Sequence, residues 1–475
     1  MTPMQLWTAA GLTLVGFAAV LASSSSQFDY ALEVADMPVW QLALGLSVAG
    51  VLFVVALPTL LLRSQQLDPR VARQVLGLVF AAGLAARQIL MASTPALEDD
   101  SYRYLWDGAV VAHGLNPYVY APAVIAKGAA PAAYTQLWSE AGIITKRINH
   151  KVVTTIYPPV AQAAFALSYL VKPWSLNAWR GLLVMFDIAT FALLVMALDA
   201  LGRSRLWTAV YWWNPVVLKE LFNSAHLEPL MFPFLLGALL FVRARKPVSA
   251  SAALAMAAGL KLWPVILLPL ILRPFVHQPK RAAAAALVFA GLMTVILAPV
   301  LSAGLSETTG LGAYASNWHR NGALFSIVQN LTQRLSALLN IGDESSANTI
   351  ARALMAATAG LIALAMAWRP VDGFQDLVFR ALVVTAALVF LSPAGYPWYT
   401  LWFLPFLVLV PEPGLLLLSA TIPLYYLFFH FAARDTPEMF SHGVIWLIWL
   451  PPLAALAWRH LWLKSETASL GGAPQ

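Results

Sequence analysis

Long apolar runs separated by short polar segments make up nearly the whole chain. Runs near or above the ~18–20 residues needed to cross a bilayer recur from one end to the other. They are rich in Trp, Phe, Leu and Ala and lack the two-residue alternation of a membrane barrel strand. The pattern therefore predicts an all-α polytopic membrane protein with about 13–14 transmembrane helices.

Two stretches depart from the simple spanning pattern. Residues 249–273 are interrupted by Lys261 and Pro264. Proline breaks helical hydrogen bonding and a lysine inside a span needs water or a partner, so we expect two half-helices that meet near the outer face. Residues 325–341 are polar enough to predict an amphipathic helix that lies along the membrane interface.

The charges between the runs predict the orientation. Basic loop residues of membrane proteins gather on the cytoplasmic side. With the N-terminus inside and the run 4–21 retained as a span rather than cleaved as a signal, the acidic loop 23–37 lies outside. The basic loops then all fall inside: 63–73, 203–205, 243–246, 273–281, 369–380 and 459–464.

This topology predicts one membrane domain over residues 1–463. Its first large outer loop, 93–156, is expected to hold amphipathic helices, and a second outer loop covers 302–345. The tail 464–475 is expected to be disordered and cytoplasmic. We expect a multi-pass protein of a bacterial inner membrane.

Composition narrows the class of protein further. Charged residues make up 11% of the chain, against about 25% in a soluble domain. The net charge of +7 is explained by cytoplasmic loops, so we expect a lipid bilayer and no nucleic acid as partner. Cysteine is absent, which excludes disulfides and thiolate metal sites. The chain also lacks GxGxxG, P-loop, HExxH and GxSxG motifs, which argues against a cytosolic nucleotide-sugar domain.

The remaining polar clusters all fall on the outer face in this topology, which predicts a site there. They are 98–107, 157–159, 223–228, Lys261, 314–321 and 392–399. Glu98, Asp99 and Asp100 directly follow a span. Their mutual repulsion near a low-dielectric boundary should raise at least one pKa, which suits a general base toward a sugar hydroxyl. The alternative is an acidic N-terminal cap on an amphipathic surface helix through Trp106 and Val110.

Other side chains could hold a phosphate or a sugar. Lys261 at the helix break suits a phosphate, or it reaches to the interface as an ordinary lysine. His226 could hydrogen-bond a ligand or bind a metal, although no second histidine completes a local zinc motif. The alternative for its neighbourhood is a Lys219–Glu220 ion pair with a helix cap. His319 and Arg320 could bind phosphate, or be solvated loop residues.

Aromatic residues near the outer boundary are the last candidates. Tyr396 and Trp398 could stack on a sugar ring, or belong to an interfacial aromatic belt.

At these residues the chain resembles the GT-C superfamily of polyprenyl-phosphate-sugar-dependent glycosyltransferases, and it is most similar to the bacterial polytopic mannosyltransferase-like branch. The resemblance extends over residues 95–402. It rests on 99–108, 114–118, 156–162, 214–215, 223–226, 261–264, Ser392 and 397–399.

The resemblance implies a GT-C-like fold and an inverting transfer of a hexose, with mannose favoured, from a polyprenyl-phosphate donor. Asp99 or Asp100 would deprotonate the acceptor hydroxyl at the extracytoplasmic face, with a slight preference for Asp99. Lys261, Arg103 and His226 would steady the phosphate. The expected binding residues are Arg103, Asp107, Tyr157, Asn223, His226, Glu228, Lys261, His319, Arg320, Tyr396 and Trp398.

The resemblance leaves the acceptor open. Many relatives have an aspartate after the histidine, where this chain has Leu227 and Glu228. A lipid, a glycan or a protein could accept the sugar. The sequence requires no cofactor, although a divalent cation, Mg²⁺ or Mn²⁺, could join Asp99 and Asp100. The alternatives are a transporter or flippase of a lipid-linked or anionic substrate, or a lipid-linked-glycan ligase or polymerase.

Overall fold

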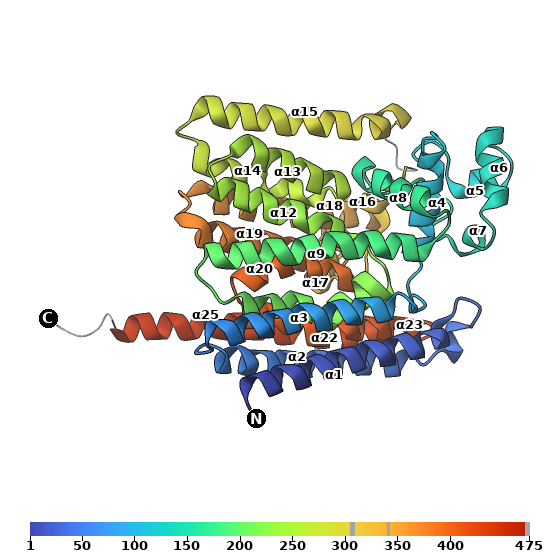
Figure 1. The fold of residues 1–475 in the computed structure, drawn as a ribbon. Coiled ribbons are helices and arrows are strands. Elements are labelled where there is room, and N and C mark those ends of the chain that lie inside the picture. Colours follow the sequence, from blue (N-terminus) through green and yellow to red (C-terminus); the bar gives the residue numbers. More distant parts are fainter. Residues whose placement is uncertain (305–308, 340–342, 471–475) are drawn as a thin grey trace.

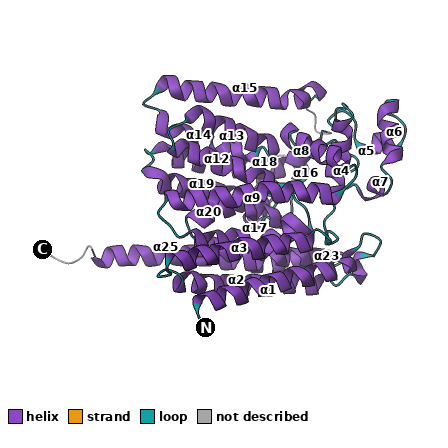
Figure 2. Ribbon diagram, in the orientation of Figure 1, coloured by secondary structure: helices purple, strands orange, loops and turns teal. Residues whose placement is uncertain are grey.

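The computed structural model describes residues 1–304, 309–339 and 343–470. The regular structure of these residues is helical, apart from an isolated bridge that joins Arg320 and Asn321 to Ala394. Figure 1 shows long helices lying side by side, and Figure 2 shows helices joined by loops. The predicted all-α class is confirmed.

Eight of the described helices are long and apolar enough to cross a membrane, so the chain is a multi-pass membrane protein. They are α1 (Pro3–Ser24, with a short extension to Phe28), α2 (Val39–Arg63), α9 (Leu176–Ala200), α15 (Pro279–Ala303), α18 (Glu344–Trp368), α19 (Gly373–Leu391), Pro413–Ala432 (α21–α23) and Pro437–Leu461 within α24–α25.

The prediction of about 13–14 spans also counted apolar segments that the structure makes short or breaks. Three of these are α8 (Pro159–Val171), α12 (Glu228–Arg243) and α13 (Pro247–Leu260). Another, α3 (Pro69–Leu90), is long and packs against α1, but it carries several arginines.

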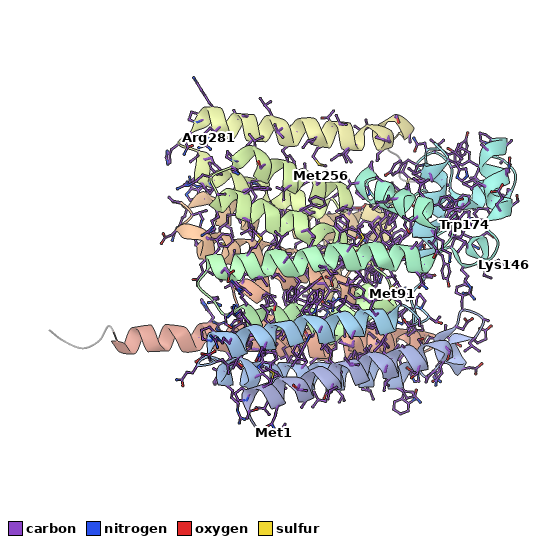
Figure 3. The ribbon with its side chains drawn as sticks, viewed as in Figure 1. Met1, Met91, Lys146, Trp174, Met256 and Arg281 are labelled. Atoms are coloured by element: carbon purple, nitrogen blue, oxygen red, sulfur yellow. The ribbon has the colours of Figure 1, made fainter. Side chains whose placement is uncertain are left out.

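The two ends of the bundle differ in what they carry. The N-terminus and the C-terminal part of α25 lie at one end in Figure 1, and α4–α7 lie at the other. Figure 3 places Arg281 near the end with the termini, and Lys146 and Trp174 at the opposite end. This arrangement agrees with the predicted separation of the large loop 93–156 from a basic loop.

The large loop 93–156 folds into four helices. They are α4 (Asp100–Ala112), α5 (Pro122–Ala126), α6 (Ala132–Glu140) and α7 (Ile143–Arg147). Trp106 and Val110 pack with residues of α5–α7 in a small separate core. On another face α4 packs against α8, and a Cβ at Gly108 would lie 2.4 Å from the carbonyl oxygen of Phe165. The expected one-sided surface helix is therefore wrong for α4, because neighbouring helices cover most of its faces.

Two helices are broken near the end that carries α4–α7. The expected break at Lys261 is present: α13 ends at Leu260, and a short helix Trp263–Leu267 and α14 (Leu268–Leu272) follow. A second break lies between α11 (Pro215–Val217) and α12. There a π-helix, Leu218–Asn223, leads into Ala225, which has a left-handed φ of 64°. Such turns cluster at functional sites because they redirect neighbouring side chains.

The remaining segments complete the bundle. The predicted amphipathic helix 325–341 corresponds to α17 (Ala323–Leu339), which packs on α18. The second outer loop, 302–345, also contains α16 (Gly310–Asn317), whereas 305–308 and 340–342 lie outside the described residues. Disorder was expected from residue 464, but α25 (Ile445–Leu470) continues to Leu470, and 471–475 lie outside the described residues. Short helices include α10 (Ala209–Trp212), Pro397–Trp402, α20 (Leu404–Leu409), α21 (Pro413–Leu416), α22 (Leu418–Thr421), α23 (Leu427–Ala432) and α24 (Pro437–Met439).

A buried ion pair joins α3 to the core. Arg87 donates to the Asp187 carboxylate of α9 at 2.6 Å, and both side chains are fully buried. The Arg87 guanidinium also lies 3.5 Å from the ring centre of Trp212 in α10. These contacts hold α3, α9 and α10 together.

Candidate active site

A cavity of about 860 Å³ brings together most of the predicted polar clusters. Its lining comes from the segments 28–37, 94–103, 149–158, 261–263, 314–320, 396–402 and 425–429. The lining is mixed: carboxylates and cations share the wall with apolar side chains such as Phe28, Met37 and Phe429. The predicted convergence of distant polar segments on one site is therefore present in the structure.

Asp99 and Asp100 lie side by side on the cavity wall at the start of α4. Asn149 bridges them, since its side-chain nitrogen donates to Asp99 at 2.9 Å and to Asp100 at 2.7 Å. Burial, reinforced by the neighbouring Asp100 charge, raises the pKa of Asp99 to about 6, although the Asn149 hydrogen bond opposes this shift. Asp99 occupies the N-cap position without a capping hydrogen bond, which speaks against the simple cap interpretation.

The two aspartates differ in how firmly they are held. Asp100 accepts hydrogen bonds from Tyr157 at 3.1 Å and from Tyr104 at 3.4 Å, in addition to Asn149. Among the described residues, Asn149 is the one side chain that donates a hydrogen bond to the carboxylate of Asp99. Asp100 is thus fixed by three donors, whereas Asp99 keeps more capacity to accept a proton from a ligand.

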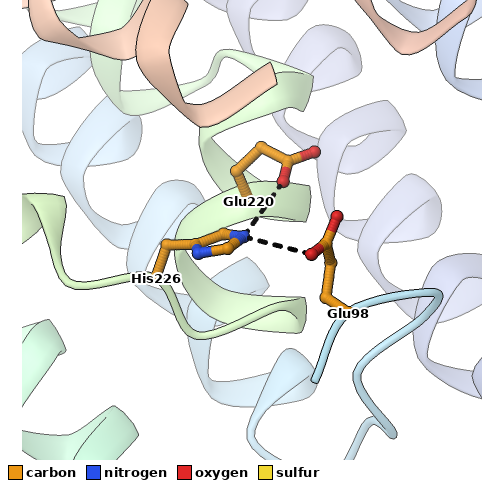
Figure 4. Close-up of side chains that lie close together, drawn as sticks. All are labelled: Glu98, Glu220 and His226. Carbon is orange, nitrogen blue, oxygen red and sulfur yellow. Dashed lines mark ion pairs between the residues drawn. The ribbon is translucent and has the colours of Figure 1, made fainter. Parts of the chain in front are cut away.

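A second group of carboxylates surrounds His226. Its Nε2 lies 3.8 Å from Glu98 and 3.7 Å from Glu220, and Figure 4 draws these two ion pairs; its Nδ1 lies 3.7 Å from Asp100. Burial raises the pKa of Glu98, an effect that the nearby Lys219 ammonium opposes. Among the described residues, Glu98, Glu220 and His226 lie close enough together to hold a metal ion. The predicted metal-binding pair, Asp99 and Asp100, is not part of this group.

Lys261 faces the cavity from the helix break. Its ammonium group pairs with the Glu228 carboxylate, which also accepts a hydrogen bond from Trp402 at 3.2 Å. The Lys261 side chain is 16% exposed, whereas that of Glu228 is fully buried. The lysine is therefore the accessible member of the pair, and it lies 5.1 Å from the ring centre of Tyr399.

Aromatic rings form one wall of the cavity. Trp398 stacks on Tyr396 with ring centres 4.6 Å apart and planes almost parallel. Trp398 also stacks on His226, with ring centres 3.9 Å apart. This stacking fixes the His226 ring in place, and the tryptophan and Tyr396 both line the cavity.

Several predicted binding residues have structural contacts instead. The Asp107 carboxylate is buried and accepts from Arg103 at 3.0 Å and from Gln162 at 3.2 Å. Arg103 reaches the cavity wall, but this ion pair and the carbonyl of Val153 occupy its guanidinium. Asn223 is buried and holds the backbone of the segment 93–96. Arg103, Asp107 and Asn223 therefore hold the structure around the cavity in place.

The two predicted phosphate-binding residues of the outer loop, His319 and Arg320, differ in position. Arg320 lines the cavity, with its guanidinium 4.0 Å from the ring centre of Phe428. His319 is exposed and is not among the residues that line the cavity. The structure therefore brings Arg320 to the site and leaves His319 outside it.

Sequence reasoning missed four residues that shape the site. Asn149 and Tyr104 hold the aspartates, and Tyr426 donates to Glu220 at 2.8 Å. Glu220 was considered only as the partner of Lys219. For Tyr426, the tyrosine pair 425–426 within an apolar run was a signal, because a buried hydroxyl needs a polar partner.

Residues 6–277 match the model of the alpha-(1->6)-mannopyranosyltransferase N-terminal domain. The chain belongs to this mannopyranosyltransferase family. Residues 326–463 match the MptB C-terminal domain. Comparisons with curated proteins and with solved structures gave no match.

The two matched regions both contribute to the cavity. Asp99 and Lys261 fall within the first region, and Tyr396 falls within the second. The protein is therefore a membrane-embedded glycosyltransferase of the mannosyltransferase type. This membership favours a transferase over the transporter, flippase, ligase and polymerase alternatives.

Proposed function

We propose that this mannosyltransferase moves mannose from a polyprenyl-phosphate donor to a hydroxyl acceptor, with inversion, at the extracytoplasmic face of the inner membrane. The observation that supports the proposal is that Asp99 and Lys261 line the same cavity. A base and an accessible cation are the two groups that transfer from a sugar phosphate needs.

Asp99 acts as the base in this proposal because it has fewer hydrogen-bond donors than Asp100. Its carboxylate takes the proton of the acceptor hydroxyl while the hydroxyl oxygen attacks the anomeric carbon. The bond from that carbon to the phosphate oxygen breaks, and its electron pair leaves with the polyprenyl phosphate. The proton passes from Asp99 to water afterwards. A positioned base of this kind contributes roughly 10²–10⁴-fold to the rate.

Lys261 and Arg320 offset the charge that develops on the departing phosphate. Both line the cavity, and electrostatic stabilisation of this kind is usually the largest catalytic contribution. Trp398 and Tyr396 line the cavity and offer an aromatic wall for the sugar ring. Arg103 and Asp107 position α4 rather than bind the donor, because their paired side chains are only 5% and 1% exposed, against 16% for Lys261.

A lipid-linked donor agrees with the apolar part of the lining. Phe28, Met37 and Leu262 line the same cavity as the charged groups. A polyprenyl chain is apolar and its phosphate is anionic, so one cavity can bind both parts. Nucleotide sugars are cytosolic, which makes a lipid phosphate the practical source of activated mannose at the outer face.

The proposal is tested with purified protein and two radiolabelled donors, polyprenyl-phosphate mannose and GDP-mannose, in the presence of membrane-derived acceptors. We expect transfer from the lipid donor alone. Asp99→Asn should lower the rate by roughly 10²-fold or more, because an amide cannot take the proton. Asp435→Asn is the control, since Asp435 is exposed and its positive φ of 54° is one that asparagine also adopts. Transfer from GDP-mannose alone, or full activity in Asp99→Asn, would refute the proposal.

A further inference from the structure

Glu98, Glu220 and His226 point three possible ligand atoms toward one another from distant parts of the chain. Glu98 lies on the loop before α4, whereas Glu220 lies in the π-helix and His226 just after it (Figure 4). Their nearest oxygen and nitrogen atoms all lie within 4.8 Å of one another. Ligands about 2.1 Å from a tetrahedral ion lie roughly 3.4 Å apart, so a small contraction would complete the site.

Two of the polar atoms that face this point, Nε2 of His226 and Oε2 of Glu220, are buried and lack hydrogen bonds. Neither ring nitrogen of His226 has a hydrogen-bond partner among the described residues, and the same holds for Oε2 of Glu220. The side chains of His226 and Glu220 are 1% and 2% exposed. Buried polar atoms without partners are rare because each costs about 1–3 kcal/mol. A cation at this point would satisfy Nε2 of His226 and Oε2 of Glu220 together.

Other side chains contact the atoms of Glu98, Glu220 and His226 that face away from the proposed ion. The hydroxyl of Tyr426 donates to Oε1 of Glu220 at 2.8 Å and lies 3.2 Å from Oε1 of Glu98. Both carboxylates are thereby fixed with Oε2 turned toward Nε2 of His226. The other ring nitrogen, Nδ1, lies 3.7 Å from Asp100. A carboxylate behind a histidine and a hydroxyl behind each acidic ligand are typical of the outer shell of a metal site.

The charge balance also leaves room for a cation. Lys219 is the ammonium group nearest to Glu220, at 3.8 Å from Oε1, which is the oxygen turned away from His226. The lysine donates to Ser224, to the carbonyl of Ala96 and to Tyr426, so its three protons have partners. One ammonium group faces the two carboxylates of Glu98 and Glu220, so this lysine offsets only part of their negative charge.

We propose that Glu98, Glu220 and His226 bind one divalent cation, Mn²⁺ or Zn²⁺. Imidazole together with two carboxylates suits these ions, whereas Mg²⁺ prefers oxygen ligands and nearly ideal octahedral geometry. Binding through Nε2 places the proton of His226 on Nδ1, where it faces Asp100. The ion therefore orients Asp100 from behind and leaves Asp99 to face the acceptor. The binding site itself does not depend on the proposed donor or acceptor.

Mn²⁺ binding tests the site without any sugar substrate. The full-length protein in detergent is freed of metal with a chelator and titrated with Mn²⁺, while the free ion is measured by electron paramagnetic resonance. We expect one bound ion per chain, displaced by Zn²⁺. His226→Ala and Glu220→Gln should weaken binding by at least about tenfold. His277→Ala is the matched control, since His277 is exposed and distant in the chain.

Two further variants keep the test decisive if His226→Ala does not fold. Tyr426→Phe removes the hydroxyl but no ligand, and it should weaken Mn²⁺ binding by about tenfold. Glu98→Gln keeps the shape of a side chain at the cavity wall and should weaken binding similarly. Wild-type protein that elutes as a single species but binds neither Mn²⁺ nor Zn²⁺ would overturn the proposal. Binding that is unchanged in Glu220→Gln, Glu98→Gln and Tyr426→Phe would overturn it as well. The transfer assay can fail independently of either result.

Discussion

The Lys261–Glu228 pair is expected to stabilise the fold and to supply the cation that faces the phosphate, and two variants separate these roles. Lys261→Met removes the cation and leaves the carboxylate of Glu228 buried and unpaired, apart from its hydrogen bond with Trp402. Loss of one partner of a buried ion pair costs about 3–5 kcal/mol, because the other charge stays in a low-dielectric site. We expect the free energy of unfolding to fall by an amount near this range, and transfer to be lost.

The double variant Lys261→Met/Glu228→Gln should recover most of that stability. A glutamine has no charge to leave unpaired, and its carbonyl oxygen can still accept the hydrogen bond from Trp402. Stability is expected to return to within about 1–2 kcal/mol of wild type. Transfer should stay lower by roughly 10²–10³-fold, because no ammonium group faces the departing phosphate.

The assay combines denaturant unfolding in mixed micelles, followed by tryptophan fluorescence, with initial rates of mannose transfer. Arg205→Met is the matched control. Arg205 pairs with Asp199 at 2.7 Å, but both side chains are about half exposed, so the loss should be about 0–1 kcal/mol. A double variant as unstable as the single one would contradict the burial argument. A double variant with wild-type transfer would contradict the role of Lys261 as the phosphate cation.

Two other predictions concern topology and packing. A reporter fused after Val119 should read as extracytoplasmic and one after Lys246 as cytoplasmic; the reverse pattern in alkaline phosphatase and fluorescent-protein fusions would overturn the positive-inside assignment. Gly108→Ala should destabilise the protein by about 1–3 kcal/mol and lower transfer, because its Cβ would lie 2.4 Å from the backbone oxygen of Phe165. Gly291→Ala, where a Cβ meets nothing within 4 Å, should leave thermal unfolding and transfer unchanged, and equal behaviour of the two variants would contradict the packing argument.

The sequence predicted the helical membrane fold because apolar length and the absence of alternation are local properties of a chain. It also predicted that the acidic segment, Lys261 and the aromatic segment 396–399 meet, because loop charges fix which ends of the helices lie together. The break at Lys261 was predictable for a similar reason, since Pro264 and a lysine within an apolar run are both visible locally.

The partners within the site could not be predicted in this way. Asn149 lies 50 residues from Asp99, and nothing in its own segment indicates that it bridges two aspartates. The π-helix Leu218–Asn223 and the left-handed turn at Ala225 direct His226 toward Glu98. Helical periodicity in the sequence carries no signal for such a turn. Asp107 was expected to bind a ligand from the family resemblance alone, yet here its carboxylate is buried and paired with Arg103.

The buried pair of Arg87 and Asp187 has a consequence for biogenesis. The two residues are 100 positions apart, so α3 leaves the ribosome well before the carboxylate that neutralises its arginine. An arginine without its carboxylate partner is costly in a site from which water is excluded. The insertion machinery therefore has to keep α3 beside water or another protein until α9 has been synthesised, and Asp187→Ala should leave nascent chains open to quality-control proteolysis.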